Sequence, residues 1–111
     1  MILNIEKINI QKRTQIEAGM KFIEKINQDG VVRKVILFGS ALTNDCDKDS
    51  DIDLCFVTDY DSKNPVFFQI YGELPLVMND LCDILIYSKV NGKIKEEIDN
   101  KGVLIYYYEK E

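Results

Sequence analysis

The fold of this chain is decided by residues 31–58, which read VVRKVILFGSALTNDCDKDSDIDLCFVT. Val31 to Phe38 is rich in β-branched residues and ends in four consecutive apolar ones, which is typical of a central strand covered on both faces. Gly39 and Ser40 end that run abruptly. After an acidic segment, Ile52 to Thr58 predicts a second strand.

The segments on either side predict a mixed architecture. Apolar residues that recur every three or four positions predict a helix over 12–29, with Ile16, Met20 and Ile23 on its inner face and a capping box from Thr14 and Glu17. Further helices are expected over 66–71 and 91–100, strands over 81–87 and 103–108, and a polar turn over 59–65. This order predicts one α/β or α+β domain spanning residues 1–111.

The net charge of −5 is concentrated in one segment. Residues 45–61 hold seven acids and one base, or −6, whereas the other residues hold 12 acids and 13 bases, or +1. A broad nucleic-acid surface would need clustered Lys and Arg, so it is not expected. The acidic segment indicates either a cation site or a solvated loop.

Composition excludes several other classes of protein. The chain has no histidine, which excludes Ser-His-Asp and Cys-His catalysis and argues against a zinc site. The three cysteines, Cys46, Cys55 and Cys82, are read as free thiols, and a cytoplasmic location is expected. No apolar run reaches 18 residues, and charges are mixed through residues 1–13, so neither a membrane span nor a signal peptide is expected.

Three acids interrupt or enter apolar strands. Asp51 and Asp53 are two apart, so their side chains lie on the same face of a strand, and Asp83 stands within the strand expected over 81–87. A carboxylate in a sheet is costly to desolvate without a positive partner, and neither strand carries a Lys or Arg. Converging carboxylates are instead natural ligands for Mg²⁺, together with water and substrate phosphates.

A phosphate site is expected next to these acids. Gly39 allows a ligand to approach the backbone closely, and a helix beginning at Ser40 would offer amide groups and a hydroxyl to an anion. A phosphate cradle beside carboxylate-bound metal is suited to phosphoryl or nucleotidyl transfer.

These motifs together resemble a known family. Leu37-Phe38-Gly39-Ser40, ten intervening residues, and Asp51-Ile52-Asp53 look like the signature of the DNA polymerase β-type nucleotidyltransferase superfamily. Ser50 before Asp51 is similar to its minimal nucleotidyltransferase (MNT) branch, and the Asp83 strand resembles the one that carries the third carboxylate. The resemblance implies a nucleotidyltransferase fold, a small mixed β-sheet with helices packed on one face.

The resemblance also implies roles for individual residues. Asp51 and Asp53 would bind two Mg²⁺ ions, Asp83 would be a further metal ligand and a general base, and Gly39 and Ser40 would hold the nucleoside triphosphate, with ATP expected. Members of this branch often pair with a helical HEPN-domain protein and act as its antitoxin, in some cases by transferring AMP to it. Such a partner is therefore expected here.

The sequence departs from the family at one place. Arg and Gly commonly follow Gly-Ser, but residues 41–44 read ALTN, which leaves Lys48 as a candidate cation from later in the loop. Two alternatives therefore stay open: a module of the same fold that neutralises its partner by contact without catalysis, and a metal-binding regulatory protein that uses no nucleotide.

The acids themselves have other interpretations. Asp45, Asp47 and Asp49 are expected to be solvated loop charges, and Asp83 could be an edge-strand charge that discourages aggregation. The spacing of the acids from Asp45 to Asp53 also fits part of an EF-hand calcium loop. That loop, however, requires Gly where Ser50 stands and Glu where Phe56 stands.

Overall fold

The structure, a computed structural model, describes residues 1–59 and 64–109. Along these residues the helices and strands follow the predicted order: α1 (Ile10–Ile26), β1 (Val32–Phe38), β2 (Ile52–Thr58), α2 (Val66–Met78), β3 (Cys82–Ile86), α3 (Gly92–Lys101) and β4 (Val103–Tyr107). Three short 3-10 turns accompany them: η1 (Ile5–Lys7) precedes α1, η2 (Gly39–Leu42) follows β1 and η3 (Tyr87–Lys89) follows β3. The polar turn predicted over 59–65 lies largely outside the described residues.

The strands form one mixed sheet in the order β3-β2-β1-β4. β1 is antiparallel to both β2 and β4, whereas β2 and β3 are parallel. The parallel pair requires a crossover connection, which α2 provides. β1 and β2, the two strands read from the opening stretch, are therefore the central pair, and the predicted mixed sheet is confirmed.

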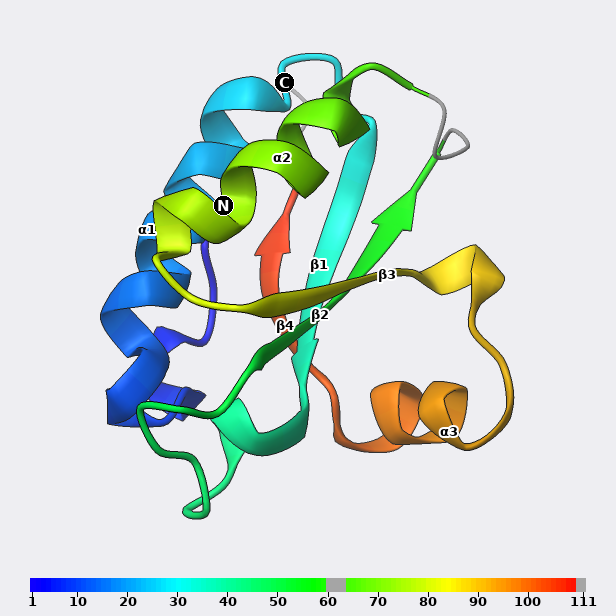
Figure 1. The fold of residues 1–111 in the computed structure, drawn as a ribbon. Coiled ribbons are helices and arrows are strands. Elements are labelled where there is room, and N and C mark those ends of the chain that lie inside the picture. Colours follow the sequence, from blue (N-terminus) through cyan, green and yellow to red (C-terminus); the bar gives the residue numbers. More distant parts are fainter. Residues whose placement is uncertain (60–63, 110–111) are drawn as a thin grey trace.

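The two long helices cover one face of the sheet, and α3 lies on the other side (Figure 1). Val35 and Leu37 of β1 belong to the main core with α1 and α2, while Phe38 and Cys55 form a second cluster with Ile98 of α3. Both faces of the central strands are apolar, so both need cover. The sequence predicted helices on one face of the sheet, and α1 and α2 lie there as predicted. The short α3 is an addition on the opposite face.

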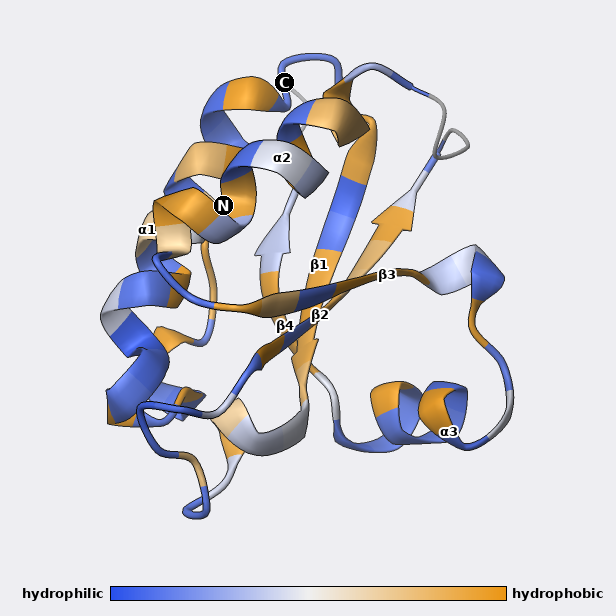
Figure 2. Cartoon of the chain, viewed as in Figure 1, coloured by the Kyte–Doolittle hydropathy of each residue, from blue (hydrophilic) through white to orange (hydrophobic). Residues whose placement is uncertain are grey.

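Close packing of α1 on α2 depends on Gly19. A Cβ atom at this position would overlap the side chain of Met78, so glycine allows the two helices to approach. Figure 2 shows the strands as predominantly hydrophobic and the segment between η2 and β2 as mostly hydrophilic. Among the described residues, no helix has both the length and the apolar composition that crossing a membrane would require.

Two helices differ from the sequence prediction. α1 begins at Ile10 because the Asn9 side chain accepts a hydrogen bond from the Gln11 amide, so the capping box predicted from Thr14 and Glu17 is wrong. α2 runs to Met78, not Tyr71, although it contains Gly72 and Pro75. Burial of one helix face holds this segment helical despite its two breakers, with four inward residues, Phe67, Ile70, Leu74 and Met78.

A charged side chain lies inside the fold. Lys12 of α1 is completely buried, and its ammonium forms an ion pair with Asp80, in the turn before β3. The same ammonium donates a hydrogen bond to the backbone oxygen of Lys48, at 3.1 Å. One side chain thus ties α1 to the acidic loop and to the turn that leads into the Asp83 strand.

Candidate functional site

β1 ends in a turn that favours glycine. Gly39 has a φ of +80°, in the left-handed region that L side chains rarely adopt. A Cβ atom on Gly39 would overlap the carboxylate of Asp53. The helix considered from Ser40 is only the single turn η2, so it offers no helix N-terminus to an anion. What the turn provides is a close approach between backbone and carboxylate.

Asn9 holds this turn in place from outside the motif. Its backbone amide donates to the oxygen of Ala41 at 2.8 Å, and its side-chain amide donates to the oxygen of Thr43 at 2.7 Å. The Thr43 hydroxyl in turn donates to the oxygen of Ser40 at 2.9 Å. The residue that caps α1 therefore also anchors the segment after β1.

The sheet register brings two of the predicted acids together. Asp53 of β2 lies opposite Phe38 of β1 on one side and opposite Asp83 of β3 on the other. Directly opposite residues on neighbouring strands place their side chains on the same face. Asp53 is partly buried, whereas Asp51 and Asp83 are exposed. Asp83 does lie on an edge strand, as its alternative interpretation requires.

The carboxyl of Asp53 is harder to ionise than an ordinary aspartate carboxyl. Its pKa is raised from 3.8 to about 6, first by burial and then by a hydrogen bond and charge repulsion from Asp83. Smaller contributions come from the charges of Asp51 and of Glu97 on α3. Three acids from separate parts of the fold, Asp51, Asp83 and Glu97, therefore raise the pKa of this carboxyl, and a bound cation would relieve their repulsion.

A cavity of about 380 Å³ opens between η2 and α3, next to Gly39, which lies against Asp53. Gly39, Leu42 and Thr43 line it on one side, and Glu97 and Lys101 line it on the other. Figure 1 shows both elements at the same end of the sheet, where β1 ends. Glu97 and Lys101 are four residues apart and so lie on one side of the helix.

Sequence comparison assigns the family. The family model described as "Polymerase beta, Nucleotidyltransferase" matches residues 20–111. The chain belongs to this nucleotidyltransferase family. The match extends over both central strands, the Gly39–Ser40 turn and the three aspartates. No protein of curated function matches the chain significantly in sequence.

Solved structures confirm the nucleotidyltransferase fold. A toxin-antitoxin structure with AMP-PNP matches with a TM-score of 0.64 and 16% identity, over 80% of this chain and 73% of the other. The MntA-HepT toxin-antitoxin matches with a TM-score of 0.58 and 15% identity, over 83% and 73%. A complex of tri-AMPylated Shewanella oneidensis HEPN toxin with MNT antitoxin gives 0.59 and 16%, over 83% and 72%. At these identities, the likeness shows the fold.

The acids of the nucleotidyltransferase domain suit Mg²⁺ in their chemistry. Carboxylate oxygens are hard ligands, and after burial the chief cause of the raised pKa of Asp53 is the neighbouring Asp83 carboxyl, a repulsion that a cation would relieve. In the part of the chain that the structure describes, no three acidic or sulfur side chains stand close enough to enclose a metal ion. Mg²⁺ is commonly held by one or two carboxylates, with water and substrate phosphates as the other ligands, so the Asp53–Asp83 pair fits it.

Sequence reasoning missed two residues that line the cavity of the candidate site. Glu97 and Lys101 reach the cavity from a helix more than 40 residues away from the aspartate motif, and no local pattern marks them. Lys48, the cation considered from the sequence, does not line this cavity; its exposed position in the acidic loop is fixed through its backbone. The cationic side chain at the cavity is that of Lys101.

The acidic loop of the nucleotidyltransferase domain supports the solvated interpretation. Asp45, Asp47 and Asp49 are exposed, and the Asp47 side chain accepts a hydrogen bond from the Asp49 amide at 2.8 Å. The flanking elements are a 3-10 turn and a strand, not the two helices of an EF-hand. Asp47 therefore helps to order the loop, while all three acids stay exposed to solvent.

The cysteines of the nucleotidyltransferase domain are free, as predicted. Burial, as the largest cause, raises the pKa of the Cys55 and Cys82 thiols to about 11. Thiols with such a pKa are almost wholly protonated at neutral pH and are poor nucleophiles. Neither of these two groups is a candidate for covalent chemistry.

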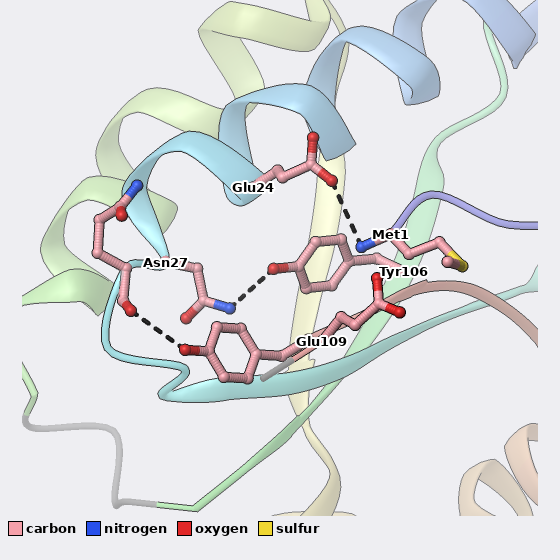
Figure 3. A pocket seen from close by; sticks show the side chains of 7 residues that line it. Met1, Glu24, Asn27, Tyr106 and Glu109 are labelled. Carbon is pink, nitrogen blue, oxygen red and sulfur yellow. Dashed lines mark hydrogen bonds and ion pairs between the residues drawn. The ribbon is translucent and has the colours of Figure 1, made fainter. Parts of the chain in front are cut away.

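A larger cavity, about 550 Å³, lies at the other end of β1 (Figure 3). There the Asn27 side chain donates to the Tyr106 hydroxyl at 2.9 Å, and Met1 forms an ion pair with Glu24. Gly39 and the aspartates are at the far end of a seven-residue strand, about 20 Å away. The larger cavity is therefore remote from the Gly39–Ser40 turn and the aspartates, and the smaller cavity is the one that adjoins this turn.

Proposed function

We propose that this chain is a Mg²⁺-dependent nucleotidyltransferase that transfers AMP from ATP to a protein partner in the cytoplasm. The partner proposed is a HEPN-type helical toxin, for which the chain acts as the antitoxin. The observation that carries the proposal is the meeting of Gly39, Asp53 and Asp83 at one end of the sheet, beside an open cavity.

The family and its neighbours support this reading. Membership of the nucleotidyltransferase family supports the reaction class. Among structures with the same fold, one holds AMP-PNP and another contains an AMPylated HEPN toxin with its MNT antitoxin. Proteins of the same fold are thus found with a nucleotide and with an AMPylated protein partner, which supports ATP as the substrate and a HEPN-type protein as the acceptor here.

In the proposed reaction, a hydroxyl oxygen of the partner bonds to the α-phosphorus of ATP. The bond from that phosphorus to the oxygen bridging to the β-phosphorus breaks, and pyrophosphate leaves with the electron pair. Asp83, exposed at the edge of the sheet, accepts the hydroxyl proton. Gly39 and Ser40 hold the triphosphate beside the carboxylates.

Asp53 and Asp83 would hold the magnesium, with phosphate oxygens and water completing its coordination, and Asp51, whose charge also acts on Asp53, is proposed as a further ligand that joins them when the ion is bound. Bound there, Mg²⁺ supplies positive charge for the phosphates and favours ionisation of the attacking hydroxyl. The pKa of Asp53, raised to about 6, should fall when a cation binds beside it.

A second function is favoured by one observation, the sequence ALTN at residues 41–44 where the family commonly carries Arg and Gly. With that cation absent from the turn, the chain would neutralise its partner by contact and would not catalyse. A metal-binding regulatory role without nucleotide is the third reading of the same acids.

Radiolabelled ATP separates these functions. The chain is incubated with the co-expressed HEPN-type protein, Mg²⁺ and ATP labelled at either the α- or the γ-phosphate. Nucleotidyl transfer predicts label on the partner from α-labelled ATP only. The Asp53→Asn and Asp83→Asn variants should lose the signal, whereas Asp45→Asn, in the solvated loop, should keep it.

Each alternative predicts a different outcome. Contact-only neutralisation predicts no label, while the Asp53→Asn variant still silences the toxin in a growth assay. A regulatory metal protein predicts Mg²⁺ binding in calorimetry with no MgATP binding. Label that persists in both aspartate variants would refute the assigned site.

A further inference from the structure

The cavity beside Gly39 is lined on its α3 side by one acidic and one basic residue. Gly39, Leu42 and Thr43 form the side next to the carboxylates, and the α3 side contributes Glu97 and Lys101. Gly39 lies against the Asp53 carboxylate and also lines the cavity, so the cavity extends from the Gly39 turn beside Asp53 towards the helix. An elongated anion with one end at Asp53 would therefore pass Gly39 and end at α3.

Charge makes Lys101 distinctive at this place. The acids that act on Asp53 are Asp51, Asp83 and Glu97, so the surroundings of the cavity are strongly anionic. Lys101 is the basic residue among those lining the cavity. An anionic polyphosphate entering here meets repulsion unless cations offset it, and this side chain supplies a fixed positive charge.

The Lys101 ammonium is also free to act on a ligand. It is exposed, and among the described residues it forms no ion pair or hydrogen bond. Lys95 on the same helix differs, because its ammonium pairs with Asp99 at 3.1 Å and lies over the Tyr87 ring. The two lysines thus separate into one that stabilises the helix surface and one that faces the cavity unpaired.

We propose that Lys101 binds the terminal phosphates of the nucleoside triphosphate and replaces, from α3, the cation missing from residues 41–44. The inference rests on the proposed function, because it needs the nucleotide to lie with its α-phosphate at the aspartates. Lys101 then meets the pyrophosphate portion, which becomes the leaving group. Its charge should favour triphosphates over monophosphates.

Nucleotide affinity measured by calorimetry tests this role without relying on catalysis. Dissociation constants for MgATP and for AMP are compared in the full chain, Lys101→Met and Lys101→Arg. Lys93→Met, at an exposed lysine in the first turn of α3, is the matched control. Thermal melting of each variant checks that the fold is retained, as expected for an exposed position.

The proposal predicts that Lys101→Met weakens MgATP binding at least tenfold and changes AMP binding less than twofold. Lys101→Arg should restore most of the MgATP affinity, and Lys93→Met should match the full chain. If Lys101→Met binds MgATP as tightly as the full chain, the Lys101 assignment is refuted while the nucleotide site stands. If the full chain itself does not bind MgATP, the proposed function and this inference are refuted together.

Discussion

Replacing Lys12 with methionine tests how much the buried Lys12–Asp80 ion pair contributes to the stability of the fold. The Lys12 ammonium pairs with Asp80, whose side chain is only 13% exposed, and it also donates to the backbone oxygen of Lys48. Methionine keeps the length of the side chain and removes its charge. Asp80 would then be a nearly buried carboxylate without its partner, and the Lys48 oxygen would lose its donor.

The size of the effect follows from the burial. Breaking a buried ion pair by removing one partner costs about 3–5 kcal/mol. A domain of this size has a free energy of unfolding of about 5–15 kcal/mol, so Lys12→Met should remove a large fraction of it. Urea denaturation followed by circular dichroism measures the loss as a lower midpoint at an unchanged slope.

Two comparisons isolate the ion pair. Lys21→Met removes an exposed pair with Glu17, whose atoms are 3.8 Å apart, and should cost less than about 0.5 kcal/mol. The double variant Lys12→Met, Asp80→Asn should cost clearly less than the sum of its single variants, because each single change leaves a buried charge alone. A Lys12→Met variant within about 1 kcal/mol of the natural chain would refute this account of the buried lysine.

Two further predictions concern the carboxyl pair and the turn. Because the pKa of Asp53 is raised to about 6, the stability gained from its protonated form is full below about pH 4 and is lost as the pH rises through 6. Without divalent cations, Asp53→Asn should therefore be about 1–2 kcal/mol more stable than the natural chain at pH 8, after allowing for solvent screening, and equal to it at pH 4. Denaturation at both pH values measures this, and a difference independent of pH would contradict it. Gly39→Ala should cost about 1–3 kcal/mol and weaken MgATP binding, since φ is +80° and the new Cβ would displace Asp53. Gly72→Ala is its control: a Cβ there meets nothing within 4 Å, so that variant should be about 0.5–1 kcal/mol more stable. Equal losses at the two glycines would show that the Gly39 conformation is not special.

The sheet and the aspartate pair were predictable because their signals are local. Alternating and apolar runs marked β1 and β2, and the i, i+2 rule placed Asp51 and Asp53 on one face. Strand pairing then needed only that the Asp83 strand be a neighbour of β2, which the crossover through α2 provides. The roles of these acids in binding metal remain a prediction.

The rest of the site depends on contacts distant in sequence. Burial of the inner face of α2 overrode Pro75, a residue that usually ends a helix, so the length of α2 could not be read locally. Lys101 and Glu97 reach the cavity only because α3 packs on the face opposite the long helices. The buried pairing of Lys12 with Asp80 likewise joins residues 68 positions apart.

The two sides of the candidate site are supported by different amounts of buried structure. Asp53 and Gly39 are attached to the two central strands, whose backbone bonds open only when the whole sheet unfolds. α3, by contrast, buries a single side chain, that of Ile98. Its detachment would uncover the small second cluster, with Phe38 and Cys55, and would leave the main core covered by α1 and α2. In hydrogen-exchange terms, we expect the amides around Asp53 and Gly39 to exchange more slowly than those of α3, so the Lys101 side of the cavity should open more readily than the side formed by the central strands.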